Sequence, residues 1–199
     1  MAARVAVLVS GGGTNLQAIL DFNRERGSFA ASEVVLVASN RASAGGLDRA
    51  RAAGIAAQVF DSTDDGSSLL SLLTSHNVSL VVLAGYLKRL PASVVKTYHR
   101  RIINIHPGLL PDFGGAGMYG SRVHAAVLEA GATTTGVTAH FVDDEFDHGP
   151  RIAEWRVPVQ PDDTVESLAA RVLAVEHVMY PRIIDLVASL NERDFFADF

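Results

Sequence analysis

The sequence lacks cysteine, long apolar runs and any excess of positive charge. Without cysteine the chain can form no disulfide and has no thiolate ligand or cysteine nucleophile. No stretch approaches the ~20 apolar residues that a membrane helix needs. The apolar run from Val5 to Val9 is too short for a signal-peptide core. We therefore expect a cytoplasmic protein that binds no membrane.

Charge and length narrow the class of protein further. The net charge of −5 argues against a basic face that binds nucleic acid, but leaves room for a local basic pocket. The hydrophobic fraction of 48% is normal for a globular protein with a real core. Because domains hold ~150 residues, we expect one domain over residues 1–199. We expect it to act on small molecules, as a monomer or a homodimer.

In the first half of the chain, short apolar runs alternate with helical segments. Such runs are typical of strands buried on both faces of a parallel sheet. We expect strands at 5–10, 34–38, 58–60, 80–84 and 101–105. Helices are expected at 15–22, 46–53 and 64–75, and a short one opens at Pro91. This alternation predicts an α/β fold, with right-handed crossovers and helices on both faces of the sheet.

The pattern changes after Pro107. Residues 108–120 form a loop rich in glycine, and a helix is expected at 124–129. The runs at 134–142 and 151–157 are close enough in sequence to pair as antiparallel strands. Residues 164–190 predict a long amphipathic helix, bent or broken at Pro181 because proline lacks the N–H of a helical residue.

The first motif that could carry chemistry is the glycine loop at 10–15, between a strand and a helix. Glycines let the backbone approach a ligand closely, and the N–H groups at a helix N-terminus suit a phosphate. A plain tight turn is the alternative. A dinucleotide fingerprint fits poorly because Leu16 stands in place of its third glycine, and the lysine of a P-loop is missing.

The second motif is Asn104-Ile105-His106-Pro107, at the carboxyl end of a predicted strand, where open α/β sheets bind ligands. Asn104 and His106 are two residues apart, so on a strand they point to the same side. An asparagine can donate to a developing oxyanion, and a histidine can donate, accept or carry charge near neutral pH. The alternative is a polar strand end whose hydrogen bonds are satisfied internally.

The third motif is acidic and covers residues 143–147, followed by His148. It could be a solvated loop or a cation site with oxygen ligands, although the spacing of an EF-hand is absent. It could also place a carboxylate beside a histidine, where it would orient the ring and favour its charged form.

Four segments, at residues 9–19, 83–90, 104–111 and 140–150, occur in an order that resembles the phosphoribosylglycinamide formyltransferases, folate-dependent enzymes of purine synthesis. The resemblance runs over nearly the whole chain. It implies a Rossmann-like formyltransferase fold with a long C-terminal helix. It also implies 10-formyltetrahydrofolate as formyl donor, the amine of 5'-phosphoribosylglycinamide as acceptor, and no metal.

The resemblance also implies roles for individual residues. The catalytic trio falls on Asn104, His106 and Asp147. The acceptor-binding residues fall on Gly11, Gly12, Gly13, Thr14, Asn15 and Glu176. The folate-binding residues fall on Leu87, Lys88, Arg89, Leu90, Asn104, His140, Asp143, Asp144, Glu145, Phe146 and Asp147. Without the resemblance, Glu176 would be an ordinary acid on a helix surface and His140 a histidine at the edge of the core.

The trio suggests a mechanism in which Asn104 and protonated His106 bind the oxyanion. Asp147 would keep His106 charged and help to move a proton, through water. We therefore expect the pKa of His106 to lie above its ordinary value of ~6.5.

Two features depart from the family pattern. Many relatives carry an arginine after Phe-Asp-Ser, where this chain has Thr63, so a folate contact is either missing or supplied from elsewhere. The loop 113–120 is also richer in glycine than in many relatives; it could be a mobile lid, but glycine content alone indicates only a permissive backbone.

Three other functions remain open from the sequence. A formyltransferase acting on aminoacylated tRNA shares the Asn-x-His-Pro chemistry but normally needs a further nucleic-acid-binding domain. A formyltetrahydrofolate hydrolase would use water in place of the amine and usually carries a regulatory domain before the first strand. A non-catalytic nucleotide-binding module would not need the trio in three separate segments.

Overall fold

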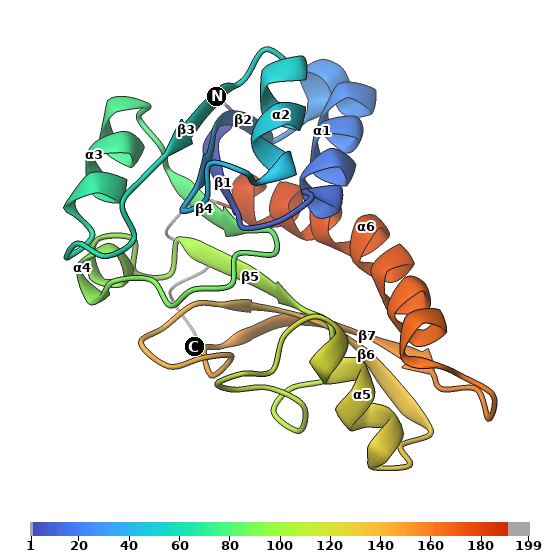
Figure 1. Cartoon of the computed structure of the whole chain (residues 1–199). Coiled ribbons are helices and arrows are strands. Elements are labelled where there is room, and N and C mark those ends of the chain that lie inside the picture. The colour runs from blue at the N-terminus through green and yellow to red at the C-terminus, as the bar shows by residue number, and fades with distance from the viewer. Residues whose placement is uncertain (1, 191–199) are drawn as a thin grey trace.

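The computed structural model describes residues 2–190, which form one seven-stranded sheet flanked by helices (Figure 1). The strands are β1 (Ala3–Val9), β2 (Ser32–Ser39), β3 (Ala56–Val59), β4 (Leu80–Leu83), β5 (Ile102–His106), β6 (Thr134–Phe141) and β7 (Arg151–Pro158). The helices are α1 (Thr14–Arg26), η1 (Gly27–Phe29), α2 (Gly45–Ala52), α3 (Ser67–Ser75), α4 (Ala92–Thr97), α5 (Ser121–Glu129) and α6 (Val165–Ser189). The predicted α/β class is confirmed.

The sheet is parallel on one side and antiparallel on the other. Its strand order is β3-β2-β1-β4-β5-β6-β7. The strands from β3 to β5 pair in parallel, whereas β6 pairs antiparallel with both β5 and β7, as the sequence predicted for the last two runs. Strand β5 is therefore the boundary: Asn104 lies opposite Leu83 of β4 on one side and opposite His140 of β6 on the other.

Two apolar layers sandwich the sheet, as the side chains of β1 illustrate. Val5, Val7 and Val9 pack with buried residues of α1, α2 and α6. Ala6 and Leu8 point to the other face and pack with α3 and α4, which lie together on one side of the sheet in Figure 1. All five side chains are fully buried. A continuous apolar run is therefore the pattern that a central strand needs.

Several helices differ from the prediction. Helix α1 continues to Arg26 and α5 begins at Ser121, so both are longer than predicted. Helix α3 begins at Ser67 rather than at residue 64, because the carboxylate of Asp64 accepts from the amides of Gly66 and Ser68 at 2.8 and 2.9 Å and closes the preceding turn. Helix α6 continues through Pro181 to its last residue, so the predicted break is wrong. None of the helices within residues 2–190 is long and apolar enough to cross a bilayer.

Helix α6 is tied to the middle of the sheet by Tyr180. This side chain is fully buried, and its hydroxyl lies 2.9 Å from the carbonyl oxygen of Leu83 and 3.1 Å from that of Ile103. Leu83 is the last residue of β4, and Ile103 directly precedes Asn104 in β5. The tyrosine therefore binds α6 to the two strands from which the candidate site is built.

Candidate active site

A cavity of about 380 Å³ opens at the carboxyl ends of β4 and β5. Its walls come from the β4–α4 loop, the end of β5, the loop before α5, the segment after β6 and one face of α6. Asn104, His106 and Asp147 all line it, so the structure brings the predicted trio together. This is the edge of the sheet where ligands bind in open α/β folds.

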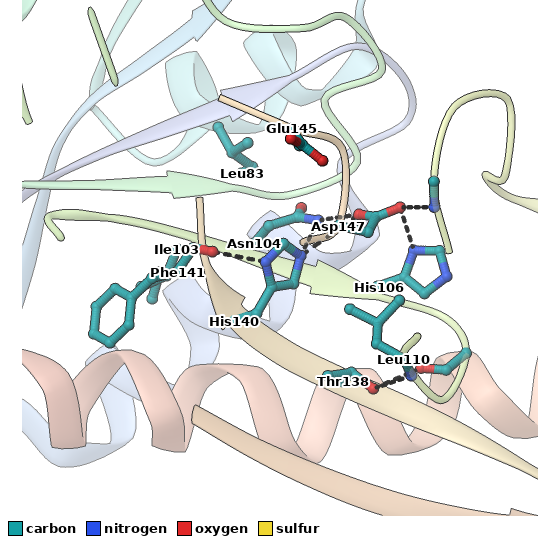
Figure 2. A network of polar contacts seen from close by, with 12 residues as sticks. Leu83, Ile103, Asn104, His106, Leu110, Thr138, His140, Phe141, Glu145 and Asp147 are labelled. Atoms are coloured by element: carbon teal, nitrogen blue, oxygen red, sulfur yellow. Dashed lines mark hydrogen bonds and ion pairs between the residues drawn. The ribbon is translucent and has the colours of Figure 1, made fainter. Parts of the chain in front are cut away.

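Asp147 is the centre of the polar network in this cavity (Figure 2). One of its oxygens, Oδ2, lies 3.4 Å from Nδ1 of His106, and the other, Oδ1, lies 3.5 Å from Nδ2 of Asn104. Oδ1 also lies 3.5 Å from Nε2 of His140, and the amide of Gly115 donates to Oδ2 at 3.1 Å. Four groups from three segments therefore converge on one carboxylate, although most of these contacts are long.

His140 orients the side chain of Asn104. A carbonyl oxygen can only accept, so Nδ1 of His140, 2.8 Å from the oxygen of Phe141, must carry a proton. In the neutral ring Nε2 then accepts from Nδ2 of Asn104 at 3.1 Å. His140 is thus more than a histidine at the edge of the core, because it sets the direction of the amide that faces the cavity.

Both ring nitrogens of His106 face acceptors. Nε2 lies 2.7 Å from the carbonyl oxygen of Phe113, so it carries a proton, while Nδ1 faces Asp147. Yet only 3% of the side chain is exposed, and burial lowers the pKa of His106. Asp147 and the Phe113 carbonyl raise it by less. The expected rise above the ordinary value is therefore wrong, because desolvation of the imidazolium outweighs a carboxylate held at 3.4 Å.

Asp147 itself remains an acid that is readily ionised. Burial raises its pKa, but the neighbouring rings of His140 and His106 and the amide of Gly115 together lower it below the ordinary value. Its backbone is left-handed, with φ of 56°, a conformation that costs a non-glycine residue energy. The backbone strain and the ionised side chain occur at the same residue.

The far end of the cavity is formed by Asn15 at the start of α1 and Glu176 on α6. Nδ2 of Asn15 donates to Oε2 of Glu176 at 2.6 Å, and both residues are buried. Burial raises the pKa of Glu176 to about 7. The alternative of an ordinary surface acid is therefore wrong, and Glu176 faces the same cavity as the trio.

The glycine loop adjoins this end without forming its wall. Gly11, Gly12 and Gly13 are not among the residues that line the main cavity, and Thr14 lines a separate, smaller one. Gly13 has φ of +74°, and a Cβ there would lie 2.6 Å from the Cα of Gly46, so the fold itself requires glycine. A Cβ at Gly11 or Gly12 would meet nothing within 4 Å. At these two positions the free protein gives no packing reason for glycine.

The predicted folate segments form the opposite wall. Leu87, Lys88, Arg89, Leu90 and His140 line the cavity, as do Asp143, Glu145, Phe146 and Asp147. Asp144 does not line it. Its carbonyl instead accepts from the guanidinium of Arg89, which joins the two segments across the rim.

Lys88 lies where the sequence departs from the family pattern. Its ammonium donates to the hydroxyl of Ser62 at 2.9 Å. Thr63 faces away into its own turn, where its hydroxyl donates to Asp61 at 2.7 Å. A cation therefore reaches the segment that lacks the family arginine, and it comes from a different part of the chain.

Two contributions to the site were missed from the sequence. His124 of α5 lines the cavity, is 4% exposed, and has an Nδ1 without a partner in residues 2–190. Its position between Val123 and Val127 on the buried face of α5 was a signal that could have revealed it. The carbonyl of Phe113 had no such signal, because the side chain does not specify where a loop carbonyl points.

No group of three or more His, Asp or Glu side chains in the described part of the chain is arranged to hold a metal ion. The site is a set of hydrogen-bonding and acid–base groups that line one cavity. Residues 3–184 match the family of formyl transferases, and the chain belongs to that family.

The similarity extends to particular relatives. The chain is 44% identical over 191 residues to the chloroplastic phosphoribosylglycinamide formyltransferase of Arabidopsis thaliana, with 92% of this chain and 65% of the relative covered. The chain spans less than two thirds of the length of the curated relatives that it matches.

Solved structures agree over nearly their whole length. Glycinamide ribonucleotide transformylase 1 from Symbiobacterium toebii superposes with a TM-score of 0.86 at 41% identity, covering 96% of this chain and 92% of that one. Phosphoribosylglycinamide formyltransferase from Anaplasma phagocytophilum gives 0.87 at 39% identity, covering 97% and 91%. The resemblance drawn from the sequence and the fold that it implied are both confirmed.

Proposed function

We propose that this chain transfers the formyl group of 10-formyltetrahydrofolate to the amine of 5'-phosphoribosylglycinamide. The products are the N-formyl amide and tetrahydrofolate, in a step of de novo purine (IMP) synthesis. We further infer that residues 1–199 act as a single formyltransferase domain. A cytoplasmic location and a monomeric or homodimeric state stay predictions; the plant relative is named chloroplastic.

The observation that carries the proposal is the position of the trio between two unlike walls. Asn104, His106 and Asp147 lie between the segments at 87–90 and 142–146 on one side and the pair Asn15–Glu176 on the other. Transfer between two substrates requires the reacting groups to meet at one place. Holding them together there gives the largest contribution to the rate of such an enzyme.

The donor fits the wall that carries Leu87, Leu90 and Phe146. These apolar side chains suit a flat aromatic ring, while the nearby backbone and carboxylates suit its polar edge. Thr63 offers no positive charge, but the ammonium of Lys88 lies beside Ser62, next to Thr63. Lys88 can therefore bind an acidic tail of the folate at the rim of the cavity.

The acceptor fits the other end. The glycine loop and the start of α1 offer backbone amides to its phosphate, and Glu176 offers a carboxylate to hydroxyl groups or to the amine. Gly11 and Gly12 have open space around the missing Cβ, which is what close approach of a ligand requires.

The trio stabilises the charge that develops during the reaction and moves a proton. The acceptor amine attacks the formyl carbon, and the carbonyl oxygen gains negative charge. Nδ2 of Asn104, whose contact to Asp147 is 3.5 Å long, can exchange that contact for the oxyanion. His106 donates a second hydrogen bond once Nε2 leaves the carbonyl of Phe113, and Asp147 stabilises its charged form. A proton moves from the attacking nitrogen to the departing folate nitrogen, through water held by Asp147.

The test is an assay of acceptor dependence. Tetrahydrofolate should form from 10-formyltetrahydrofolate only when 5'-phosphoribosylglycinamide is present, and the N-formyl product should form in equal amount. Asn104→Ala serves as a control for folded but impaired enzyme. Equal turnover without the acceptor would show that water is the acceptor and that the chain is a hydrolase.

A further inference from the structure

Helix α2 donates two hydrogen bonds to carbonyls of the glycine loop at residues 10–15. The amide of Gly46 donates to the carbonyl of Gly11 at 3.1 Å, and Nε of Arg49 donates to the carbonyl of Gly12 at 2.7 Å. The next carbonyl, that of Gly13, accepts within the first turn of α1. Three successive carbonyls are therefore fixed by groups outside the loop.

Fixing a carbonyl also fixes the neighbouring amide. In a trans peptide the C=O and the following N–H point in opposite directions. The amides of Gly12 and Gly13 therefore point away from α2. Neither they nor the amide of Thr14 donates to a protein acceptor within residues 2–190. Consecutive free amides at the start of a thirteen-residue helix are a suitable place for an anion.

A second observation shows that this corner is built for a ligand. Asn15, the next residue, is 8% exposed and lines the main cavity, yet its Oδ1 has no partner within the described residues. A buried polar atom without a partner is costly unless a ligand or water satisfies it. The free amides and this free acceptor are consecutive in the chain.

Arg49 has a second contact that fixes its direction. Its NH1 group donates to Oε1 of Gln17 on α1 at 3.1 Å, while Nε holds Gly12. The planar guanidinium thus spans the gap between α2 and α1 with two donors of fixed geometry, which a lysine cannot reproduce.

We propose that Arg49 is a positioning residue for the acceptor: by holding the Gly12 carbonyl, it turns the loop amides toward the acceptor phosphate. The inference rests on the proposed function, because it takes the loop as the phosphate site. Arg49 acts through the loop rather than by touching the reacting atoms, so its removal weakens acceptor binding and leaves the chemical step intact.

The experiment compares Arg49→Gln with Arg51→Gln. Arg51 lies on the same helix, is half-exposed, and pairs with Asp48 at 2.7 Å away from the loop, so its removal changes the charge of α2 equally. For Arg49→Gln the KM for the phosphorylated acceptor should rise about tenfold or more, as for loss of a hydrogen bond from a charged donor. The kcat should stay within about twofold. Arg51→Gln should leave both constants unchanged.

An acceptor without the phosphate sharpens the test. Glycinamide riboside should react with the same kcat/KM in the wild-type protein and in Arg49→Gln, since it does not use the loop. With the phosphorylated acceptor, the KM of Arg49→Lys, which keeps the charge but not the planar fork of donors, should lie between the KM of the wild-type protein and that of Arg49→Gln. If Arg49→Gln and Arg51→Gln raise the KM equally, or if the riboside suffers as much as the phosphorylated acceptor, the positioning role is overturned.

A binding measurement separates this inference from the proposed function. Inorganic phosphate should raise the melting temperature of the wild-type protein and of Arg51→Gln, but much less that of Arg49→Gln. This arm needs no formyl transfer. Loss of phosphate binding in Arg49→Gln together with no transfer by the wild-type protein would reject the function and keep the role of Arg49. If the wild-type protein transfers the formyl group but Arg49→Gln has an unchanged KM and unchanged phosphate binding, the proposed function is kept and the role of Arg49 is rejected.

Discussion

The two ends of the cavity are held together in different ways. At the trio, Asp147 meets His106, Asn104 and His140 at 3.4 to 3.5 Å, distances at which hydrogen bonds are weak. At the acceptor end, Asn15 meets Glu176 at 2.6 Å and Arg49 meets the glycine loop at 2.7 Å. The first set consists of side chains near the limit of contact, and the second of short bonds and fixed backbone.

This difference matches the tasks that we propose. A phosphate brings the same charge before and after reaction, so its site can be fixed in advance. The oxyanion exists only during reaction. Asn104 gives up only a 3.5 Å contact with Asp147 to meet it, which costs little and favours the transition state over the free protein. His106 must instead exchange a 2.7 Å bond to the carbonyl of Phe113 for a bond to the oxyanion.

The largest effect is expected at the trio. Asp147→Asn keeps the shape and removes the charge, so the rate should fall by ~10²-fold or more. Asp147 raises the pKa of His106 against the effect of burial, so any rate limb set by loss of the His106 proton should move to lower pH. The pH–rate profile measures this shift. Asn104→Ala should lower the rate with little movement of the limb.

A double replacement examines whether the trio works as a unit. Changing both His106 and Asp147 should cost much less than the product of the two single effects, because either change already removes the charged pair. Steady-state rates of the four proteins complete the cycle. Full additivity of the two losses would contradict the paired mechanism even if formyl transfer were established.

The glycine loop should show a smaller and more selective effect. Gly12→Ala adds a methyl group where the free protein has open space, so the fold should persist and the acceptor KM should rise about tenfold. Gly13→Val is a poor test, since its side chain would meet Gly46 at a left-handed φ. A change in folate affinity alone for Gly12→Ala would show that the loop serves the other substrate.

Glu176 should make stability depend on pH. Its pKa is raised to about 7 in the folded protein, so folding favours the protonated acid, and this stabilisation is lost as the pH rises from the unfolded pKa through 7. Glu176→Gln, which stays neutral, should therefore melt a few degrees above the wild-type protein at pH 8 and close to it at pH 5. Exposed Glu25→Gln should show no such difference. A gain for Glu176→Gln that is the same at both pH values would contradict the raised pKa.

The smallest effect is expected for Thr63→Arg. Lys88 already reaches Ser62, so a second cation should tighten folate binding by only about threefold. Binding titrations of folate with this variant and with Lys88→Ala measure both contributions. If Lys88→Ala leaves folate affinity unchanged, then Lys88 does not replace the family arginine.

The strands and the shared side of Asn104 and His106 could be predicted because both depend on local pattern, whereas Asp147 was assigned only through the family resemblance. Continuous apolar runs such as Val5–Val9 mark central strands, and the spacing of Asn104 and His106 places both on one side of β5. The pKa of His106 could not be predicted, because it depends on how deeply the ring is buried. The burial of Glu176 depends on Asn15, 161 residues away, and so lay beyond any local pattern.

Strand β5 has a consequence for the order in which the protein becomes active. It joins the parallel part of the sheet, complete by His106, to the β6–β7 hairpin, and Asp147 lies between those last two strands. During synthesis Asn104 and His106 therefore emerge before Asp147, while the face of the parallel strands that packs against α6 is still uncovered. Helix α6, which carries Glu176, follows later still. A chain released early would hold half of the machinery and could not carry out the transfer that we propose.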